Sequence, residues 1–269
     1  MDIINDFELK LTDCFQKLKI NLNDNIYITG NVGILARVRI EKQLKMSLFL
    51  KALKNNVGIS GTIFSPSASM NLMNTEIPFD IDNTPSNKMG AFAEYFRKLS
   101  GSIRTDHPFW SVSGQGPNAN ILKNVSRHSY GAGSPWSHFL ELDVKQINMG
   151  IHPSKAVTLI HHIETTFGVP YRYTKEFSHP IKRNNKIVNE FYYQSVMYKN
   201  CSIQKKILLN EHFFEEMKIQ NKLQEFQHPS GLVFWSFRMK DFYNIVIEFF
   251  KKDIYTYLEN PPSNRPYNN

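Results

Sequence analysis

Residues 158–164 read Thr-Leu-Ile-His-His-Ile-Glu, and this stretch organises the interpretation of the whole chain. It follows a predicted buried strand and opens a predicted helix. His161 and Glu164 are three residues apart, so on a helix they lie on one face. A carboxylate there can hold an imidazole in one tautomer, which a general base requires. A helix start with a structural histidine and a surface glutamate has the same spacing, so other motifs must decide.

The composition indicates a globular protein with a core of ordinary size. The chain has 269 residues, of which 41% are hydrophobic and 13% aromatic. No run approaches the roughly 18 apolar residues of a membrane span, and the first residues lack the features of a signal peptide. We therefore expect a cytoplasmic protein with no membrane partner. The two cysteines, Cys14 and Cys201, form neither a disulfide framework nor a metal-ligand spacing, and we expect no metal.

The net charge of +8 allows several kinds of partner. The basic residues are scattered, and no helix-turn-helix or zinc-finger signature accompanies them. A phosphorylated small molecule such as a nucleotide or coenzyme A would also suit a basic cleft, and solvated lysines explain most of the excess. We predict no nucleic-acid partner. A nonenzymatic nucleic-acid binder, with binding that weakens steeply with salt, remains the competing class.

Hydrophobic periodicity predicts strands and helices that alternate up to about residue 170. An antiparallel part then follows over residues 181–210, and a helix over residues 241–258. This order predicts a mixed α/β fold. We expect one domain over residues 1–259 and a disordered tail at 260–269, which holds three prolines. The other predicted helices cover 6–20, 41–54, 86–99 and 135–140, and the predicted strands cover 26–28, 61–64 and 144–151.

Three further motifs are candidates for binding. Arg104 and His107 flank a loop before a proline, and arginine binds carboxylates or phosphates through its planar fork. Gly131 to Ser134 precede a predicted helix start, where backbone N–H groups attract anions. Asp80 lies before another helix start and offers a carboxylate for an amine. A proline-held loop, an ordinary glycine-rich turn and helix capping explain the same motifs without function.

Taken in order, these motifs resemble the aminoglycoside 3-N-acetyltransferase family. Each piece is weak alone, but their order and spacing are specific, and the likeness covers roughly residues 10–180. The matching pieces are Gly61-Thr62-Ile63 with Pro66-Ser67, Phe79-Asp80 with Thr84-Pro85-Ser86, Met89-Gly90 with Phe96-Arg97, Arg104 with His107-Pro108 and Ser111, Gly131 with Ser134-Pro135, and Thr158 with His161 and Glu164.

The resemblance implies a coenzyme A-dependent N-acyltransferase whose mixed sheet is flanked by helices. The catalytic histidine of the family maps onto His161, and Glu164 would orient it, with His162 as a bystander. Acyl-CoA would be a co-substrate, and no cofactor would be tightly bound. The predicted residues for binding coenzyme A and the acceptor are Thr29, Asn31, Ser67, Asp80, Arg104, His107, Gly131, Ser134 and Thr158.

One departure from the family pattern bears on the substrate. The family has a His-Ser-Ser-Leu-like stretch after its first strand, and here residues 29–32 read Thr-Gly-Asn-Val. This also resembles a branch that acylates nucleotide-linked amino sugars for surface polysaccharides such as O-antigen or capsule. The preferred acceptor is a deoxythymidine-diphosphate-linked 3-amino-3,6-dideoxyhexose, the acyl group is acetyl or a small hydroxyacyl such as 3-hydroxybutyryl, and the aromatic residues 190–198 would help to form the acceptor pocket.

Two further expectations concern the alternative substrate and the chemistry. An aminoglycoside acetyltransferase that confers antibiotic resistance is the alternative, although a polycationic drug favours an acidic cleft and this chain is basic. Arg104 would hold substrate phosphates. Oxyanion donors would come from backbone N–H groups near Gly30 and Asn31 or from the Thr158 side chain. The sequence leaves the acyl group, the sugar and a homo-oligomeric state open.

Overall fold

Strand β1 (Asn25–Gly30) lies at the centre of a seven-stranded mixed sheet in the computed structural model. The structure describes residues 3–31, 39–202, 210–229, 231 and 233–259. β1 pairs in parallel with β2 (Thr62–Pro66) and β5 (Lys145–Met149), whereas the outer pairs are antiparallel. The sheet order is β3-β4-β2-β1-β5-β9-β8, with β3 at Ile103–Arg104, β4 at Val112–Gln115, β8 at Gln224–Gln227 and β9 at Val233–Arg238.

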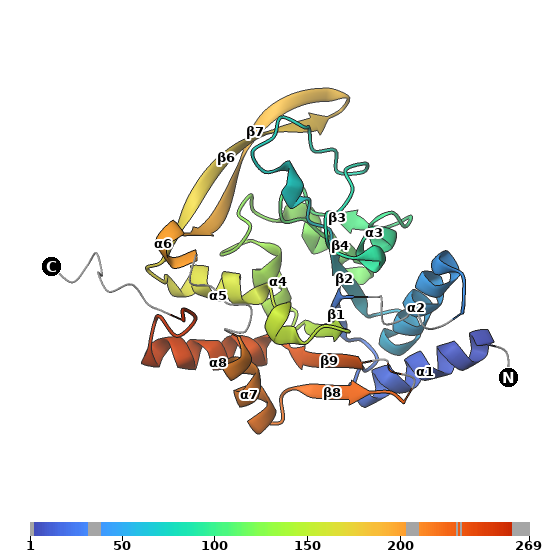
Figure 1. Ribbon diagram of the computed structural model, residues 1–269. Coiled ribbons are helices and arrows are strands. Elements are labelled where there is room, and N and C mark those ends of the chain that lie inside the picture. The colour runs from blue at the N-terminus through green and yellow to red at the C-terminus, as the bar shows by residue number, and fades with distance from the viewer. Residues whose placement is uncertain (1–2, 32–38, 203–209, 230, 232, 260–269) are drawn as a thin grey trace.

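Helices cover both faces of this sheet, which gives three layers (Figure 1). Because side chains alternate along a strand, Ile26 and Ile28 of β1 pack with helices α1 and α2, while Tyr27 packs with α4, α5 and α8. The helices are α1 (Ile3–Lys17), α2 (Lys42–Val57), α3 (Ala91–Arg97), α4 (Pro135–Glu141), α5 (Leu159–Phe167), α6 (Lys199–Ser202), α7 (Glu211–Ile219) and α8 (Met239–Lys252), and 3₁₀ turns span Met70–Leu72, Pro117–Asn124 and Pro153–Lys155.

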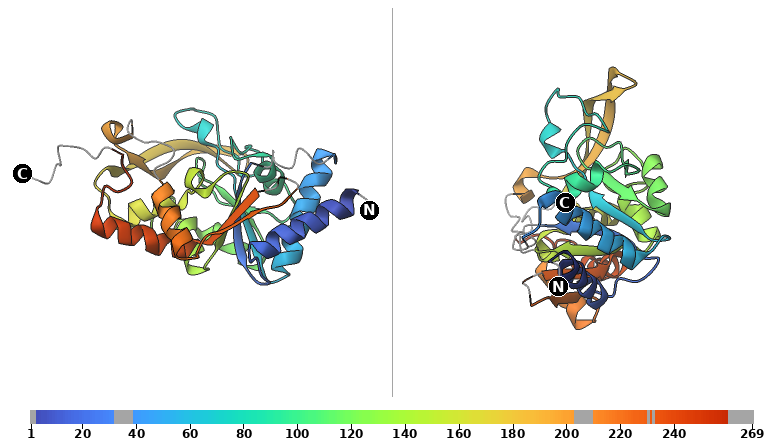
Figure 2. Two further views of the ribbon diagram at one scale, coloured as in Figure 1. Left: turned by 60° about the horizontal axis from the view of Figure 1, so that its bottom comes forward. Right: turned by 90° about the vertical axis from the view of Figure 1, so that its right-hand side faces the viewer.

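A long hairpin forms a second sheet and extends away from the three layers (Figures 1 and 2). It consists of β6 (Arg172–Arg183) and β7 (Lys186–Met197), which pair in antiparallel register along their full length. Asn184 and Asn185 both have positive φ angles, 47° and 64°, as a two-residue hairpin turn requires. Ile181 and Tyr192 attach the hairpin to the main body by packing in a small apolar cluster with Phe79 and Phe109.

The predicted mixed α/β fold with an antiparallel C-terminal part is confirmed, with three corrections. The helix predicted over residues 241–258 spans Met239–Lys252 and so ends six residues early. The antiparallel hairpin begins at Arg172, nine residues earlier than predicted, and residues 203–209 of the predicted segment lie outside the described residues, as does the predicted disordered tail. The helix predicted from Ser86 begins at Ala91. Ser86 instead donates from its backbone N–H and its hydroxyl to the Glu94 side chain, both at 2.8 Å, so the loop before the helix is tied to the helix's first turn.

Within the described ranges, none of the helices combines the length and apolar character needed to span a lipid bilayer.

Candidate active site

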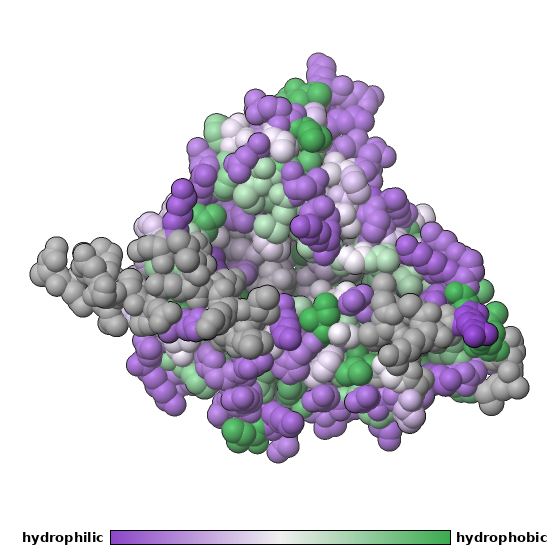
Figure 3. Space-filling view, viewed as in Figure 1, coloured by the Kyte–Doolittle hydropathy of each residue, from purple (hydrophilic) through white to green (hydrophobic). Residues whose placement is uncertain are grey.

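A cavity of about 290 Å³ lies at the carboxyl ends of the parallel strands β1, β2 and β5. Thr29 and Gly30 end β1, Pro66 ends β2, and Ile151 follows β5, and all four line the cavity. Thr158, which immediately precedes helix α5, lines it as well. Ligands of open α/β sheets bind outside the carboxyl ends of the strands. The face drawn in Figure 3 is hollowed near its middle, below the hairpin.

His161 lies one helical turn beyond Thr158 and contacts a buried carboxylate. Its Nδ1 is 2.9 Å from Oε2 of Glu164, and the Glu164 side chain has no exposed surface. The His161 side chain is 18% exposed. With Glu164 accepting from Nδ1–H, Nε2 becomes the nitrogen that takes a proton. The structure therefore shows the geometry that the three-residue spacing predicted, and the glutamate is a core residue, not a surface one.

Arg172, at the start of β6, completes this group. Its Nε is 2.8 Å from Oε2 of Glu164, and its Nη2 is 2.9 Å from Nδ1 of His161. Gly168 brings the arginine back beside the helix because it ends α5 in the left-handed conformation, with φ 78° and ψ 43°. Burial raises the pKa of the Glu164 carboxyl, but Arg172 and His161 outweigh this effect and hold that pKa below its ordinary value.

Aromatic rings connect the cavity to His161. Trp110 and Trp136 line the cavity, and their ring centroids are 5.8 Å and 6.4 Å from that of Tyr130. Tyr130 in turn packs edge-on against His161 at 5.5 Å. Burial raises the pKa of the Tyr130 hydroxyl well above its usual value, so this side chain stays neutral. Packed aromatic rings therefore link the cavity wall to His161, which is not itself among the lining residues.

His162 has a structural role that also involves two predicted binding residues. Its Nδ1 accepts from the backbone N–H of Gly131 at 3.2 Å and lies 3.4 Å from the Ser134 hydroxyl. Ser134 is buried and donates to the carbonyl of Gly131 at 2.7 Å. The Gly131–Ser134 turn is thus held onto helix α5. Its serine hydroxyl faces internal partners, contrary to the ligand contact that the sequence predicted.

Stability should therefore depend on pH through His162, whose pKa burial lowers to about 4. In the unfolded chain the His162 imidazole takes up a proton near pH 6.5, whereas in the folded chain it does so only near pH 4. The free energy of unfolding therefore falls as the pH drops through this window. We expect His162→Gln to reduce that slope by about 1.4 kcal/mol per pH unit. Urea unfolding of both proteins between pH 4 and 7 measures the slope, and equal slopes would contradict the assignment.

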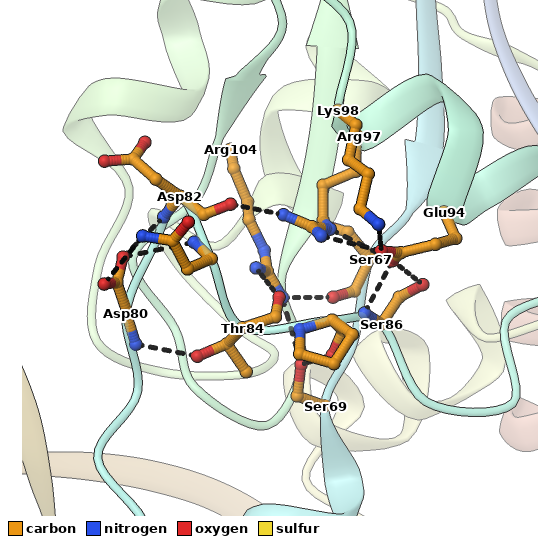
Figure 4. A network of polar contacts seen from close by, with 12 residues as sticks. Ser67, Ser69, Asp80, Asp82, Thr84, Ser86, Glu94, Arg97, Lys98 and Arg104 are labelled. Atoms are coloured by element: carbon orange, nitrogen blue, oxygen red, sulfur yellow. Dashed lines mark hydrogen bonds and ion pairs between the residues drawn. The ribbon is translucent and has the colours of Figure 1, made fainter.

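Arg104 and Ser67 belong to a separate buried network, not to the cavity wall (Figure 4). The Arg104 side chain is buried, and the Ser67 carbonyl accepts from its Nη2 at 2.6 Å. All of the Arg104 nitrogens are directed at internal acceptors and none at the cavity, and its role as a phosphate ligand stays a prediction. Besides Ser67, those acceptors are Ser111 Oγ, the Ile81 and Thr84 carbonyls and Ser69 Oγ, at 2.6–3.2 Å.

Asp80 and His107 likewise organise loops. Asp80 accepts from the backbone N–H groups of Asp82 and Asn83 and from the Lys182 ammonium at 2.9 Å. These contacts, that of the Asn83 side chain first, hold the pKa of the Asp80 carboxyl below its usual range. The ring of His107 is buried, its Nδ1 accepts from two backbone N–H groups within its own loop, and burial lowers its pKa to about 4. Neither residue lines the cavity, contrary to the predicted ligand contacts.

The predicted residues at the strand ends have mixed outcomes. Thr29 and Thr158 line the cavity and remain candidates for ligand contact. The backbone N–H of Asn31 donates to the Met149 carbonyl at 2.7 Å, so this amide is engaged in the sheet and is not the predicted oxyanion donor. Gly30 has φ 126°, and a Cβ there would lie 2.2 Å from the Met149 oxygen, so the close approach of β1 and β5 requires glycine.

Sequence reasoning missed Arg172 and the two tryptophans that line the cavity, Trp110 and Trp136. Arg172 follows Glu164 by eight positions, which on a continuous helix would place the two about 12 Å apart along the axis, and only the reversal at Gly168 brings them together. Its position shortly after a glycine and a proline that end the helix was the one available signal. The Trp110 and Trp136 rings come from different segments, and no spacing links them.

In the aromatic segment 190–198, Tyr192 is buried against His107, with ring centroids 5.2 Å apart, and its role in acceptor binding stays a prediction.

Comparison with known proteins gives one family and one fold. The family model for aminoglycoside 3-N-acetyltransferase matches residues 39–251. The chain is similar to a structure of AAC-VIa bound to sisomicin, with a TM-score of 0.77, 18% identity and coverage of 91% of this chain and 97% of that one. It is also similar to AAC-IIIb in a binary complex with CoASH (TM-score 0.76, 17% identity, coverage 91% and 96%). The apoenzyme of the aminoglycoside acetyltransferase AAC(3)-IVa is similar as well (0.75, 20%, 94% and 92%).

Proposed function

Because this chain belongs to the aminoglycoside 3-N-acetyltransferase family, we propose that it transfers an acetyl group from acetyl-CoA to an amine of an amino sugar, with His161 as general base. The observation that carries the proposal is the 2.9 Å contact between His161 Nδ1 and the buried Glu164 carboxylate, one turn from the cavity. The solved structure of AAC-IIIb with CoASH supports coenzyme A as the donor.

The proposed reaction is a direct transfer of the acetyl group from coenzyme A to the acceptor amine. His161 removes a proton from the acceptor ammonium, and the free amine nitrogen attacks the thioester carbonyl carbon. The resulting oxyanion is stabilised by donors near the cavity, for which the Thr158 hydroxyl is a candidate. The carbon–sulfur bond then breaks, the nitrogen loses its remaining surplus proton to solvent, and the imidazolium returns the first proton to the departing thiolate, which yields the amide, CoASH and a neutral His161. Cys14 and Cys201 are buried, so no acyl-cysteine intermediate is invoked.

Aminoglycosides are the first candidate acceptors. The family description and the sisomicin complex of AAC-VIa support this choice most directly. Thiol release from acetyl-CoA in the presence of an aminoglycoside panel tests it. Turnover with aminoglycosides and none with nucleotide-linked amino sugars would identify a resistance-type enzyme. Release with neither group of acceptors, under conditions in which the protein is folded, would remove the proposed function.

Nucleotide-linked amino sugars are the second candidate, because of the charge around the cavity. Its described lining contains two exposed lysines, Lys88 and Lys155, and no carboxylate. An acceptor with several ammonium groups finds no counter-charge there, whereas the diphosphate of a nucleotide sugar does. The deoxythymidine-diphosphate-linked 3-amino-3,6-dideoxyhexose is the preferred member of this class. The same assay with acetyl-CoA and 3-hydroxybutyryl-CoA tests it, and a step of surface-polysaccharide synthesis would follow from turnover.

Replacing both lysines by alanine should reveal which substrate brings phosphates to this cavity. We expect the KM for that substrate to rise about tenfold, because charge-assisted hydrogen bonds to phosphate are lost. Steady-state kinetics with each substrate varied in turn separates the donor from the acceptor. Lys54→Ala, on the exposed surface of α2, is the matched control. If neither KM moves, the lysines do not contact phosphate.

A further inference from the structure

Three polar side chains, those of His161, Glu164 and Arg172, contact one another around Nδ1 of His161. The Glu164 carboxylate oxygen lies 2.9 Å from it, and Nη2 of Arg172 lies 2.9 Å from it. The third side of this triangle is the 2.8 Å contact between Arg172 Nε and the same carboxylate oxygen. The side chain of Arg172 is 8% exposed and that of Glu164 is not exposed at all. Charges at this depth interact far more strongly than they do in water.

We propose that Arg172 is a positioning residue that keeps the His161 imidazole neutral, and so able to accept a proton, at neutral pH. The inference rests on the proposed role of His161 as general base. Two effects act in the same direction. The guanidinium balances the charge of Glu164, which would otherwise attract a proton to the imidazole. In addition, the positive guanidinium, 2.9 Å from Nδ1, repels the positive charge that an imidazolium would carry.

The remaining titratable groups around His161 do not supply this effect. The rings of Tyr130 and Tyr257 pack edge-on against the imidazole at 5.5 Å and 6.5 Å, and Tyr171 lies near Glu164. Burial raises the pKa of all three phenols, so they are neutral near pH 7. Among the groups described here, the charge balance around the imidazole is therefore set by Glu164 of α5 and Arg172 of β6.

Arg172 also has a structural contact, which the experiment must separate from the proposed role. Its Nη1 donates to the Ser195 carbonyl of β7 at 3.3 Å, so the residue helps to hold the base of the hairpin. A loss of activity alone would not distinguish the two roles. The pH dependence does, because loosening the hairpin has no reason to move the pH at which the His161–Glu164 pair takes up a proton.

The test is the pH profile of kcat/KM for wild type and Arg172→Gln, measured with acetyl-CoA and an accepted amine. We expect the acidic limb to move up by about 1–3 pH units in the variant, because removing the positive charge of Arg172 leaves the Glu164 carboxylate unbalanced and favours the imidazolium. Activity would then fall about tenfold or more at pH 7 and largely recover at pH 9. Arg172→Lys keeps the positive charge and should restore most of the wild-type profile.

Two further measurements keep the proposal falsifiable. Arg183→Gln removes ion pairs of the same hairpin to Asp106 and Glu190 without contacting His161, and it should leave the profile unmoved. NMR titration of the His161 imidazole, without substrate, should show the same upward shift in Arg172→Gln. An unshifted titration in a folded variant overturns the proposal. If the imidazole titrates as expected but the wild-type protein turns over no amine, the proposed function is wrong and the proposed effect of Arg172 on His161 still holds.

Discussion

His161→Ala is expected to lower kcat by about 100-fold or more, the usual contribution of a general base. The acceptor ammonium can no longer lose its proton to a positioned group, whereas the lining of the cavity is unchanged. The KM for acetyl-CoA should therefore stay near the wild-type value. Steady-state kinetics at saturating acceptor, together with a denaturation curve to show that the variant is folded, measure both quantities.

His138→Gln provides the matched control for this variant. His138 lies on α4 and contacts only the neighbouring Glu141 among the ion pairs described, at 3.1 Å, away from the cavity lining. Its replacement should leave kcat within about twofold, as for other substitutions distant from the chemistry. A folded His161→Ala protein that kept near-full kcat would show that the His161–Glu164 pair is structural and that proton removal occurs elsewhere.

Arg104→Ala is expected to lower the free energy of unfolding by about 3–5 kcal/mol, since it removes a buried charged group that joins several segments. Five internal oxygens each lose one donor, and burial prevents water from replacing it. The guanidinium also stacks over the Phe79 ring at 4.8 Å, and this contact is lost too. Urea unfolding measures the change.

Arg127→Ala distinguishes a buried network from an exposed ion pair. The Arg127 side chain is 52% exposed, and it forms a surface pair with Glu190, so its loss should cost less than about 1 kcal/mol. If Arg104→Ala does not fold, Arg104→Lys serves instead, because it keeps the charge and loses the planar fork. A stable Arg104→Ala protein with a raised KM for acetyl-CoA would restore the phosphate-binding role that the sequence suggested.

The sequence by itself determined the fold class and the pairing of His161 with Glu164. Alternating strands and helices predict a mixed α/β protein, and residues i and i+3 of a helix share a face whatever surrounds them. The spacing therefore places the imidazole and the carboxylate within reach of each other, whereas the burial of Glu164 depends on the segments packed around α5. Both conclusions depend on local geometry, which is why periodicity and spacing were sufficient to reach them.

Tertiary structure alone decided which of the other motif residues face the cavity. Arg104, His107 and Asp80 occupy loops, and a loop side chain points outward or inward according to the segments packed on it. Here Arg104 satisfies carbonyl groups from segments distant in sequence, and an arginine at the same position with fewer internal acceptors would be free to bind phosphate. Arg172 shows the reverse case, because it belongs to no motif and yet contacts His161. The left-handed reversal at Gly168 and the pairing of β6 with β7 place it there.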